Sequence, residues 1–298
     1  MQLGLIGLGK MGHNLALNLS RNNHKVYGYD TSTVAKEKLE QSGVSTVGSL
    51  DELIHNLPAR KVIWIMVPAG KTVDIIINNL AQYLRSGDII IDGGNSNFKN
   101  TQERGRELEK IGLHLLDCGT SGGVEGALNG ACTMVGGSPE IFSYCEPIFK
   151  SISVPNGYLY CGPCGSGHFV KMVHNGIEYG MMQAIGEGFE LMNKQYPELD
   201  LGAVAHMWNH GSVVRSWLME LAENALSKDK NLESIKGVAH ASGEGQWAVE
   251  TALEMGVPMP VITMSLLMRH RSQNEDTFSA KLVAALRNEF GGHGVEKK

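Results

Sequence analysis

The N-terminal segment places the strongest constraint on the fold, because a glycine pattern lies between an apolar run and an amphipathic one. Leu3–Leu8 predicts a strand, the glycines of Gly7-Leu-Gly-Lys-Met-Gly12 follow, and Met11–Arg21 has the periodicity of a helix. Glycines at this spacing permit a tight turn and a close approach to a pyrophosphate, which the free N–H groups of a helix N-terminus can bind. The segment therefore predicts the first strand, turn and helix of a dinucleotide-binding fold.

The alternation of strands and helices continues through the first half of the chain. Further strands are predicted at 25–29, 62–67, 89–92, 114–117 and 132–135, and helices at 33–41, 73–83 and 101–109. Alternation of this kind predicts a parallel sheet that is covered by helices on both faces. We therefore expect residues 1–164 to form a Rossmann-type, doubly wound α/β domain.

The pattern changes from about Gly165, where long amphipathic segments follow one another. Helices are predicted at 169–193, 203–210, 216–224, 245–255, 260–270 and 277–288. A stretch rich in glycine and proline, Gly162–Gly167, precedes them and is typical of a domain junction. We expect residues 165–298 to form an all-α domain.

The composition excludes several classes of function. The net charge of the 298 residues is −5, which gives no general basic surface for nucleic acid or anionic lipid. The longest apolar runs, such as Val62–Val67, are too short to span a membrane, and the N-terminus has no signal-peptide pattern. Five cysteines, an odd number, suit a reducing compartment. We expect a cytoplasmic protein that binds neither nucleic acid nor membranes.

An acidic residue indicates which dinucleotide would bind. Asp30 ends the second predicted strand, about 20 residues after the glycines, and no arginine follows in Thr31–Ala35. A carboxylate there accepts hydrogen bonds from a free ribose diol and repels a 2′-phosphate, which favours NAD over NADP. The alternative is a glycine turn without a ligand. The residues expected to contact NAD are Gly7, Leu8, Gly9, Lys10, Met11, Gly12, Asp30, Val67, Pro68 and Asn95.

A polar stripe runs along the first helix of the second half, within His168–Tyr179. It consists of Lys171, His174, Asn175 and Glu178, at helical spacing i, i+3, i+4 and i+7. Val170, Val173 and Ile177 form an apolar face on another side. Lys171 and Glu178 are two turns apart, about 10 Å along the axis, which is too far for an i,i+4 ion pair. Such a stripe predicts convergence on one bound small molecule rather than a solvated face, the alternative.

The two charged ends of this stripe suit acid–base catalysis. An amine that loses hydration in a closed cleft gives up its proton more easily, so we expect Lys171 to act as a general base. A carboxyl group that is partly removed from water keeps its proton more easily, so we expect Glu178 to act as a general acid. His174 and Asn175, between them, can orient hydroxyl groups or a carboxylate.

A second set of small residues follows the predicted strand that ends at Asp117. The stretch Thr120-Ser-Gly-Gly-Val-Glu-Gly126 offers backbone N–H groups that can approach a carboxylate or hydroxyl groups closely. A plain glycine-rich turn is the alternative.

Taken together and in order, four segments resemble the 6-phosphogluconate dehydrogenase family. They are GLIGLGKMG, DGGNS, TSGGVEGA and HFVKMVHNGIEYG. The resemblance continues through WNHGSVVRSWLMELAENA, ASGEGQWAVETAL and ALRNEFGGH and so covers the chain from end to end. The length and Asp30 are similar to those of the short, bacterial, NAD-type branch within the β-hydroxyacid dehydrogenase superfamily.

The resemblance implies oxidative decarboxylation of 6-phosphogluconate to ribulose 5-phosphate and CO₂, with Lys171 as base, Glu178 as acid and no metal. It further implies a homodimer or homotetramer in which C-terminal tails are exchanged. The implied phosphate-binding residue is Arg269, and Arg287 and His293 are the implied contacts from the tail of a second subunit. The other implied substrate contacts are Asn95, Ser121, Gly122, Gly123, His174, Asn175 and Tyr179.

The sequence departs from the family pattern near the implied phosphate site. Ser242 and Glu244 stand where longer relatives carry lysine and threonine, and Gln246 stands where short relatives tend to carry a basic residue. The substrate could therefore be gluconate or another sugar acid.

Two rival functions and one rival motif stay open. A non-decarboxylating β-hydroxyacid dehydrogenase would need Lys171 but neither Glu178 nor Arg269, and a non-catalytic NAD-sensing protein would need no acid or base. Cys161-Gly-Pro-Cys164 has the CxxC spacing of a thioredoxin-like redox site. Two reduced cysteines in a turn are the favoured interpretation.

Overall fold

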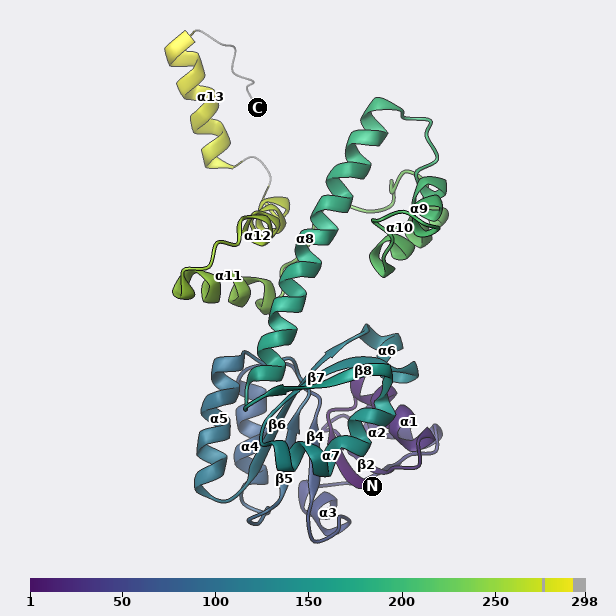
Figure 1. The fold of residues 1–298 in the computed structure, drawn as a ribbon, viewed down its shortest axis with the longest axis vertical. Helices are drawn as coiled ribbons and strands as arrows, with labels where there is room; N and C mark the ends of the chain where they lie inside the picture. Colours follow the sequence, from purple (N-terminus) through teal and green to yellow (C-terminus); the bar gives the residue numbers. More distant parts are fainter. Residues whose placement is uncertain (275–276, 292–298) are drawn as a thin grey trace. The chain divides into compact units, whose positions relative to one another are not determined.

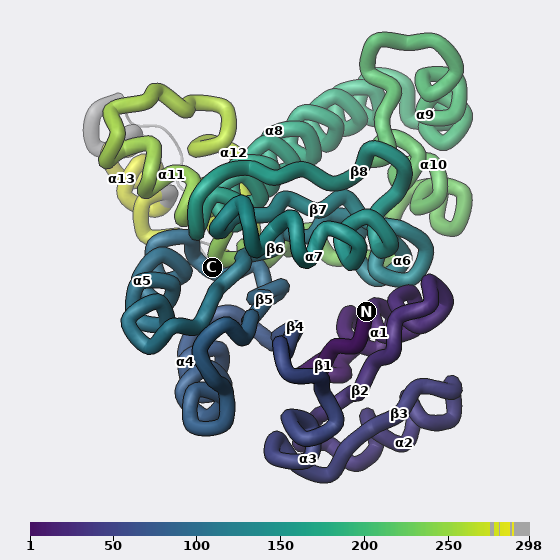
Figure 2. Tube along the Cα trace, turned by 60° about the horizontal axis from the view of Figure 1, so that its bottom comes forward, coloured from purple at the N-terminus to yellow at the C-terminus, as the bar shows by residue number. Residues whose placement is uncertain are grey.

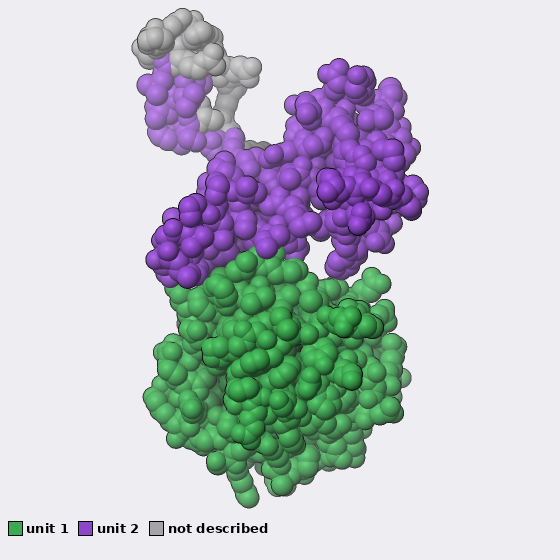
Figure 3. Space-filling model, viewed as in Figure 1, with its two compact units in different colours: residues 1–174 green, residues 175–298 purple. Residues whose placement is uncertain are grey.

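The structure is a computed structural model that describes residues 1–274 and 277–291 (Figure 1). The chain divides into two compact units, Met1–His174, called unit 1, and Asn175–Lys298, called unit 2 (Figure 3). The division lies inside α8, the helix Ser166–Gln195, and so falls later than the predicted junction after residue 164. The first turns of α8 therefore belong to the unit that contains the sheet.

Unit 1 is built on one eight-stranded sheet with the order β3-β2-β1-β4-β5-β6-β7-β8 (Figure 2). The neighbours from β3 to β6 pair in parallel, β7 is antiparallel to β6, and β8 is parallel to β7. The strands are β1 Gln2–Ile6, β2 Lys25–Tyr29, β3 Ser45–Thr46, β4 Val62–Ile65, β5 Ile89–Asp92, β6 His114–Ser121, β7 Ala131–Gly136 and β8 Ser153–Gly162.

Helices cover both faces of this sheet. They are α1 Lys10–Arg21, α2 Thr33–Gln41, α3 Leu50–His55, α4 Lys71–Leu80, α5 Phe98–Lys110, α6 Gly123–Asn129 and α7 Pro139–Ile152. One buried cluster joins Trp64 of β4 to residues of α1, α2 and α7, including Phe149. The other joins Ile63 and Ile65 of the same strand to residues of α3, α4 and α5. Successive residues of β4 thus enter opposite cores, which explains why this strand is apolar throughout.

The predicted doubly wound α/β fold is confirmed, with two corrections at the β7–β8 edge. The sheet is not wholly parallel, and β8 was not predicted as a strand. Pro155, Asn156 and Gly157 interrupt the strand pattern of β8, and Asn156 has a positive φ of 62°. An edge strand tolerates such residues because one of its sides has no neighbouring strand to bond. The short elements β3, α3 and α6 and the longer helix α7 were also missed.

The described part of unit 2 is helical, as predicted. After α8 come α9 Leu201–Asn209, α10 Trp217–Lys228, α11 Gly243–Met255, α12 Pro260–Ser272 and α13 Phe278–Gly291. Local signals determine several ends: Asp200 and Ser216 accept N-cap hydrogen bonds from Ala203 and Met219, and left-handed Gly256 ends α11. Within residues 1–274 and 277–291, no helix combines the length and apolar character needed to cross a membrane.

The five cysteines are unpaired, and their surroundings bear on the CxxC motif. Cys164 lies against α5, where a Cβ at Gly105 would come within 2.6 Å of its Sγ, and it donates to the carbonyl oxygen of Thr101 at 3.6 Å. Burial raises the pKa of Cys164 to about 12, and it also raises the pKa of Cys161. A redox-active CxxC depends on a thiol whose pKa is lowered. The structure therefore favours the interpretation as two reduced cysteines.

Alkylation tests this interpretation. At pH 8, a thiol with a pKa of about 12 stays protonated and reacts slowly, and burial of Cys145 raises its pKa to about 12 as well. We expect iodoacetamide to modify exposed Cys132 in the native protein and to leave Cys145 and Cys164 unmodified until the protein is denatured. Peptide mass spectrometry measures each site. Native labelling of Cys164 as fast as that of Cys132 would contradict the prediction.

Candidate active site

The glycine turn after β1 forms a cradle in which each glycine has a distinct role. Gly7 has a φ of 94°, and a Cβ there would lie 2.3 Å from the carbonyl oxygen of Met66. A Cβ at Gly12 would lie 1.8 Å from the carbonyl oxygen of Gly7, so Gly7 lets the turn approach the loop after β4, and Gly12 lets α1 pack against the turn. A Cβ placed at Gly9 would meet no atom of the described residues within 4 Å, apart from those of Gly9 and its immediate chain neighbours. Gly9 therefore leaves a surface that a ligand can approach.

The N-terminus of α1 opens onto this cradle. Gly9 is its N-cap residue, and within the described chain neither a capping side chain nor a first-turn acidic residue satisfies its N–H groups. Free N–H groups at the positive end of a helix bind phosphate oxygens. The cradle thus fits the pyrophosphate of a dinucleotide, with Gly9, Lys10 and Met11 supplying the N–H groups.

Asp30 is held beside the glycine turn by two backbone hydrogen bonds. Its Oδ2 accepts from the N–H of Leu8 at 2.7 Å, and its Oδ1 accepts from the N–H of Ser32 at 2.8 Å. Each carboxylate oxygen keeps a further lone pair with which to accept from a ribose hydroxyl. A cavity of about 300 Å³ opens here, and its lining includes Lys10, His13, Ser32 and Lys38.

The loops after β4 and β5 lie at the same edge of the sheet. Val67 and Pro68 follow β4, and a Cβ at Gly94 would lie 2.5 Å from the carbonyl oxygen of Val67. Asn95 has a positive φ of 53°. Its Oδ1 accepts from the N–H of Thr120 at 3.0 Å, and its Nδ2 donates to the Thr120 carbonyl at 3.4 Å. Asn95 thus ties the β5 loop to the end of β6.

Lys171, the first residue of the predicted polar stripe, is buried, with only 5% of the residue exposed. Its Nζ lies 3.3 Å from Nδ1 of His174, and Nε2 of that histidine lies 3.1 Å from Oγ of Ser121. A chain of polar contacts thus joins an amine on α8 to a hydroxyl at the end of β6. Two predicted site residues of α8 thus meet a third, Ser121, from a distant part of the sequence.

Glycines lie beside Lys171 and directly after Ser121. A Cβ at Gly119 would lie 2.4 Å from Cβ of Lys171, so only glycine allows α8 to lie this close to β6. Gly122 and Gly123 follow Ser121, and both have the positive φ that glycine favours. Gly119 was missed from the sequence, although an isolated glycine inside a strand is a signal of close backbone approach.

A second group of predicted residues comes together in unit 2. The guanidinium of Arg269 lies 3.4 Å from the ring centroid of Tyr179, a cation–π contact. The Tyr179 hydroxyl lies 2.9 Å from Oγ of Ser242 and accepts from the N–H of Ser242 at 2.7 Å. Arg269 also donates to the carbonyl oxygen of His240 at 3.4 Å. The loop before α11 is thereby joined to α8 and α12.

Four further predicted residues belong to α8 and to the C-terminal tail. Asn175 and Glu178 are half-buried on α8, and Glu178 follows Lys171 by two helical turns. Arg287 belongs to α13, but its side chain lies outside the described part of the structure. His293 lies outside the described residues. The predicted contribution of the tail therefore stays a prediction.

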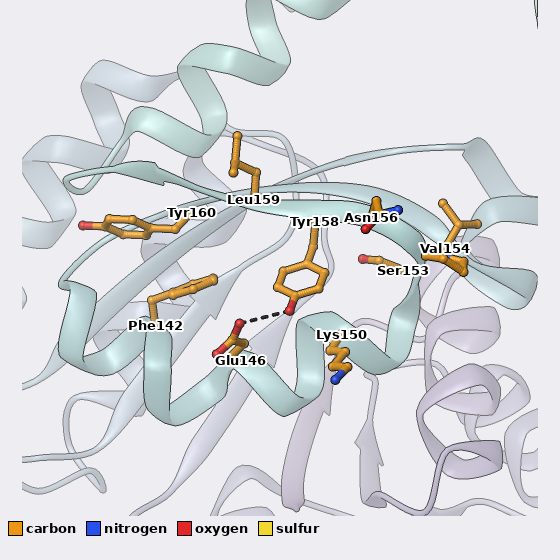
Figure 4. A pocket seen from close by; sticks show the side chains of 10 residues that line it. Phe142, Glu146, Lys150, Ser153, Val154, Asn156, Tyr158, Leu159 and Tyr160 are labelled. Atoms are coloured by element: carbon orange, nitrogen blue, oxygen red, sulfur yellow. Dashed lines mark hydrogen bonds between the residues drawn. The ribbon is translucent and has the colours of Figure 1, made fainter.

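One prominent cavity lies away from all of these residues. It has a volume of about 640 Å³ and opens between α7 and the edge strand β8 (Figure 4). Phe142, Tyr158 and Tyr160 line it, and the Tyr158 hydroxyl donates to Oε1 of Glu146 at 3.0 Å. Its described lining includes none of the predicted site residues.

Across residues 1–274 and 277–291, no cluster of three His, Cys, Asp or Glu side chains is placed to hold a metal ion.

Comparisons with known proteins agree with this arrangement. Residues 2–162 match the family model of the NAD binding domain of 6-phosphogluconate dehydrogenase, and residues 167–281 match that of its C-terminal domain. YqeC of Bacillus subtilis, provisionally named a 6-phosphogluconate dehydrogenase, is 52% identical over the full length of both chains. An NAD(+)-dependent, decarboxylating 6-phosphogluconate dehydrogenase of Haloferax volcanii is 42% identical over 100% of this chain and 99% of its own.

A solved structure gives the same result. The 6-phosphogluconate dehydrogenase of Plasmodium falciparum superposes with a TM-score of 0.86 at 32% identity, over 100% of this chain and 66% of that one. The family models span both units, and full-length relatives exceed 40% identity. With its glycine cradle and the contacts of Lys171, the chain belongs to the 6-phosphogluconate dehydrogenase family.

Proposed function

We propose that the chain oxidises and decarboxylates 6-phosphogluconate to ribulose 5-phosphate and CO₂, with NAD as the hydride acceptor. The observation that carries the proposal is the buried amine of Lys171, which is in contact with His174 and, through it, with Ser121. The name of the Haloferax relative, an NAD(+)-dependent and decarboxylating enzyme, supports the same reaction.

The first step is the oxidation of C3. Bound NAD would accept the hydride. Neutral Lys171 takes the proton of the C3 hydroxyl as the hydride leaves that carbon, so the alcohol becomes a ketone. Burial favours this role because an amine with little hydration is easier to hold in its neutral form. The contact with His174 orients the amine.

The second step is the loss of the C1 carboxylate as CO₂. Its bonding electrons flow toward the C3 carbonyl and leave an enediolate, and protonated Lys171 donates a hydrogen bond to its negative oxygen. Glu178 then gives its proton to the carbon that carried the carboxylate, which completes ribulose 5-phosphate. Lys171 acts first as base and then as hydrogen-bond donor, so one amine serves both steps.

Arg269 is the proposed partner of the substrate phosphate. A guanidinium stacked on Tyr179 is oriented by the ring and keeps N–H groups for phosphate oxygens. Two residues that depart from the family pattern near Arg269 have partners within the chain. Ser242 contacts Tyr179, and Nε2 of Gln246 donates to Oε1 of Glu250 at 2.7 Å. Gluconate, which lacks the phosphate, is therefore the alternative substrate to compare.

Two substitutions test the mechanism. We expect Lys171→Met and Glu178→Gln each to lower CO₂ release from 6-phosphogluconate by at least about 100-fold, the usual contribution of a general acid or base. Both variants should still bind NADH. Absorbance at 340 nm follows NADH, and trapped ¹⁴CO₂ follows decarboxylation of labelled substrate.

Lys110→Met is the matched control, because that lysine is exposed and pairs with Glu107 on the surface of α5. Near-normal turnover by Lys171→Met would overturn the mechanism. NADH formation without CO₂ by the wild type would indicate a non-decarboxylating dehydrogenase. No NADH formation with either 6-phosphogluconate or gluconate would indicate a nucleotide sensor.

Asp30 supports NAD over NADP. Its carboxylate is held in place by two backbone N–H groups, where it would repel a 2′-phosphate. Relatives do not decide the matter, because the Haloferax enzyme is named NAD(+)-dependent and the Plasmodium structure was solved with NADP+.

We expect Asp30→Asn to shift the ratio of kcat/KM for NAD⁺ over NADP⁺ toward NADP⁺ by at least about tenfold, since 1.4 kcal/mol of lost repulsion suffices for this. The amide keeps one acceptor for the glycine turn. Steady-state kinetics with both cofactors measure the ratio, and Glu37→Gln, an exposed position of α2, is the control. An unchanged ratio in Asp30→Asn would remove the basis for NAD selectivity.

Exposed apolar residues on α8 support assembly with a second copy of the chain. Two residues of the expected apolar face are exposed in the described structure, Val170 at 39% and Ile177 at 52%, and so are Met181 at 40% and Leu191 at 71%, further along α8. Large apolar side chains on α10, α12 and α13, such as Trp217, Val261 and Phe278, are exposed as well. Large apolar side chains left exposed in such number are typical of subunit interfaces. We therefore propose a homodimer or homotetramer that buries this face, with exchange of the C-terminal tails as a further expectation.

Light scattering coupled to size-exclusion chromatography tests the assembly. We expect the wild type to have at least twice the mass of the chain, and Leu191→Glu to dissociate because a charge would enter the apolar interface. Ile75→Glu, at an exposed apolar position on α4 of unit 1, should leave the mass unchanged. A monomeric wild type would contradict the proposal.

A further inference from the structure

A fully buried carboxylate, Asp117 of β6, binds the start of α8. Its Oδ1 accepts from the N–H of Gly165 at 2.7 Å, and its Oδ2 accepts from the N–H of His168 at 2.8 Å. Because α8 begins at Ser166, these are N–H groups that the helix itself cannot satisfy. Both carboxylate oxygens therefore hold the first turn of the helix on the sheet.

The side chain of His168 holds the same turn from another direction. Its Nδ1 lies 2.8 Å from Oγ1 of Thr101 on α5, and its Nε2 lies 3.1 Å from the carbonyl oxygen of Asp92, the last residue of β5. His168, Thr101 and Asp92 are all buried. The first turn of α8 is thus connected to two strands and one helix.

Close backbone packing removes the remaining freedom of this turn. A Cβ at Gly167 would lie 2.4 Å from the carbonyl oxygen of Met134 on β7. One turn later, the contact between Gly119 and Lys171 likewise leaves no space for a side chain at position 119. Lys171 follows His168 by one helical turn. A shift of the helix start would therefore move the Lys171 amine relative to Ser121, with which it shares His174.

We propose that Asp117 is a positioning residue that places the Lys171 amine for catalysis. The inference rests on the proposed function, in which Lys171 is the base. Asp117 acts through the backbone of α8 rather than by touching the substrate. Its effect belongs to kcat, because a displacement of about 1 Å in a reacting group can cost on the order of 100-fold in rate. The glycine cradle and Asp30 do not depend on it, so nucleotide affinity should be unaffected.

The direct test is Asp117→Asn. The amide oxygen can still accept one hydrogen bond, but the amide nitrogen would face an N–H group, so one of the two bonds is lost. We expect kcat for 6-phosphogluconate to fall at least about tenfold, toward the cost of such a displacement, and the dissociation constant of NADH to stay within about twofold. Steady-state kinetics on the full chain give kcat, and fluorescence titration with NADH gives the dissociation constant.

Asp88→Asn is the matched control. Asp88 is also buried and also accepts two backbone N–H groups, from Lys61 and Arg85, both at 2.8 Å. It precedes β5, whereas Asp117 pairs in register with Asp92 at the other end of that strand. We expect Asp88→Asn to lower the melting temperature about as much as Asp117→Asn does, because each substitution removes one buried hydrogen bond. Unlike Asp117→Asn, it should leave kcat unchanged.

Thr101→Val is the second variant, and it keeps the inference testable should Asp117→Asn fail to fold. It removes the hydroxyl group beside His168 and conserves side-chain volume, so we expect a smaller fall in kcat with unchanged NADH affinity. The inference is overturned if the folded Asp117 and Thr101 variants keep kcat within about twofold of wild type, or if Asp88→Asn loses as much kcat as Asp117→Asn. Loss of turnover in Lys171→Met together with full turnover in Asp117→Asn would reject the positioning role alone.

Discussion

An amine removed from water must recover polar contacts from the protein, and this requirement organises the site around Lys171. The residue is buried where α8 lies against β6, and His174, one turn further along the helix, provides a contact that Ser121 extends to the sheet. Each partner comes from an element whose position depends on the sheet. The surroundings of the amine therefore depend on how helix and sheet are packed, and not on the helix alone.

The sheet delivers the site residues through its carboxyl edge, where the parallel strands end. The turn after β1, Asp30 after β2 and the Asn95 loop after β5 meet there. The strand β6 continues beyond its parallel register with β5, which ends at Asp117, and pairs with antiparallel β7 as far as Ser121. This extension carries Gly119 and Ser121 past the edge to α8. The antiparallel pair of β6 and β7, which departs from the doubly wound pattern, thus provides the surface against which Lys171 packs.

The sequence was most informative where function depends on short-range spacing. The glycine turn, Asp30 and the stripe of Lys171 and His174 are each visible within a few residues or one strand–helix unit, and the helices of unit 2 follow from their periodicity. Asp117 and His168 were not identified, because their partners lie 48 to 76 residues away and depend on tertiary packing. β8 was missed because proline, asparagine and glycine interrupt its pattern. The exposure of Val170 and Ile177 could not be predicted either, since a helical apolar stripe does not show which surface covers it.

The contact between Gly119 and Lys171 limits how the protein can change over evolutionary time. Any side chain at position 119, even a methyl group, would push the helix away from the strand and carry the amine with it. New substrate preferences must therefore arise at the periphery, at positions such as Gln246, whose exposed side chain is free of this steric limit. A gene library that keeps β6 unchanged and randomises α11 would therefore preserve the position of Lys171 while its variants are screened on other sugar acids.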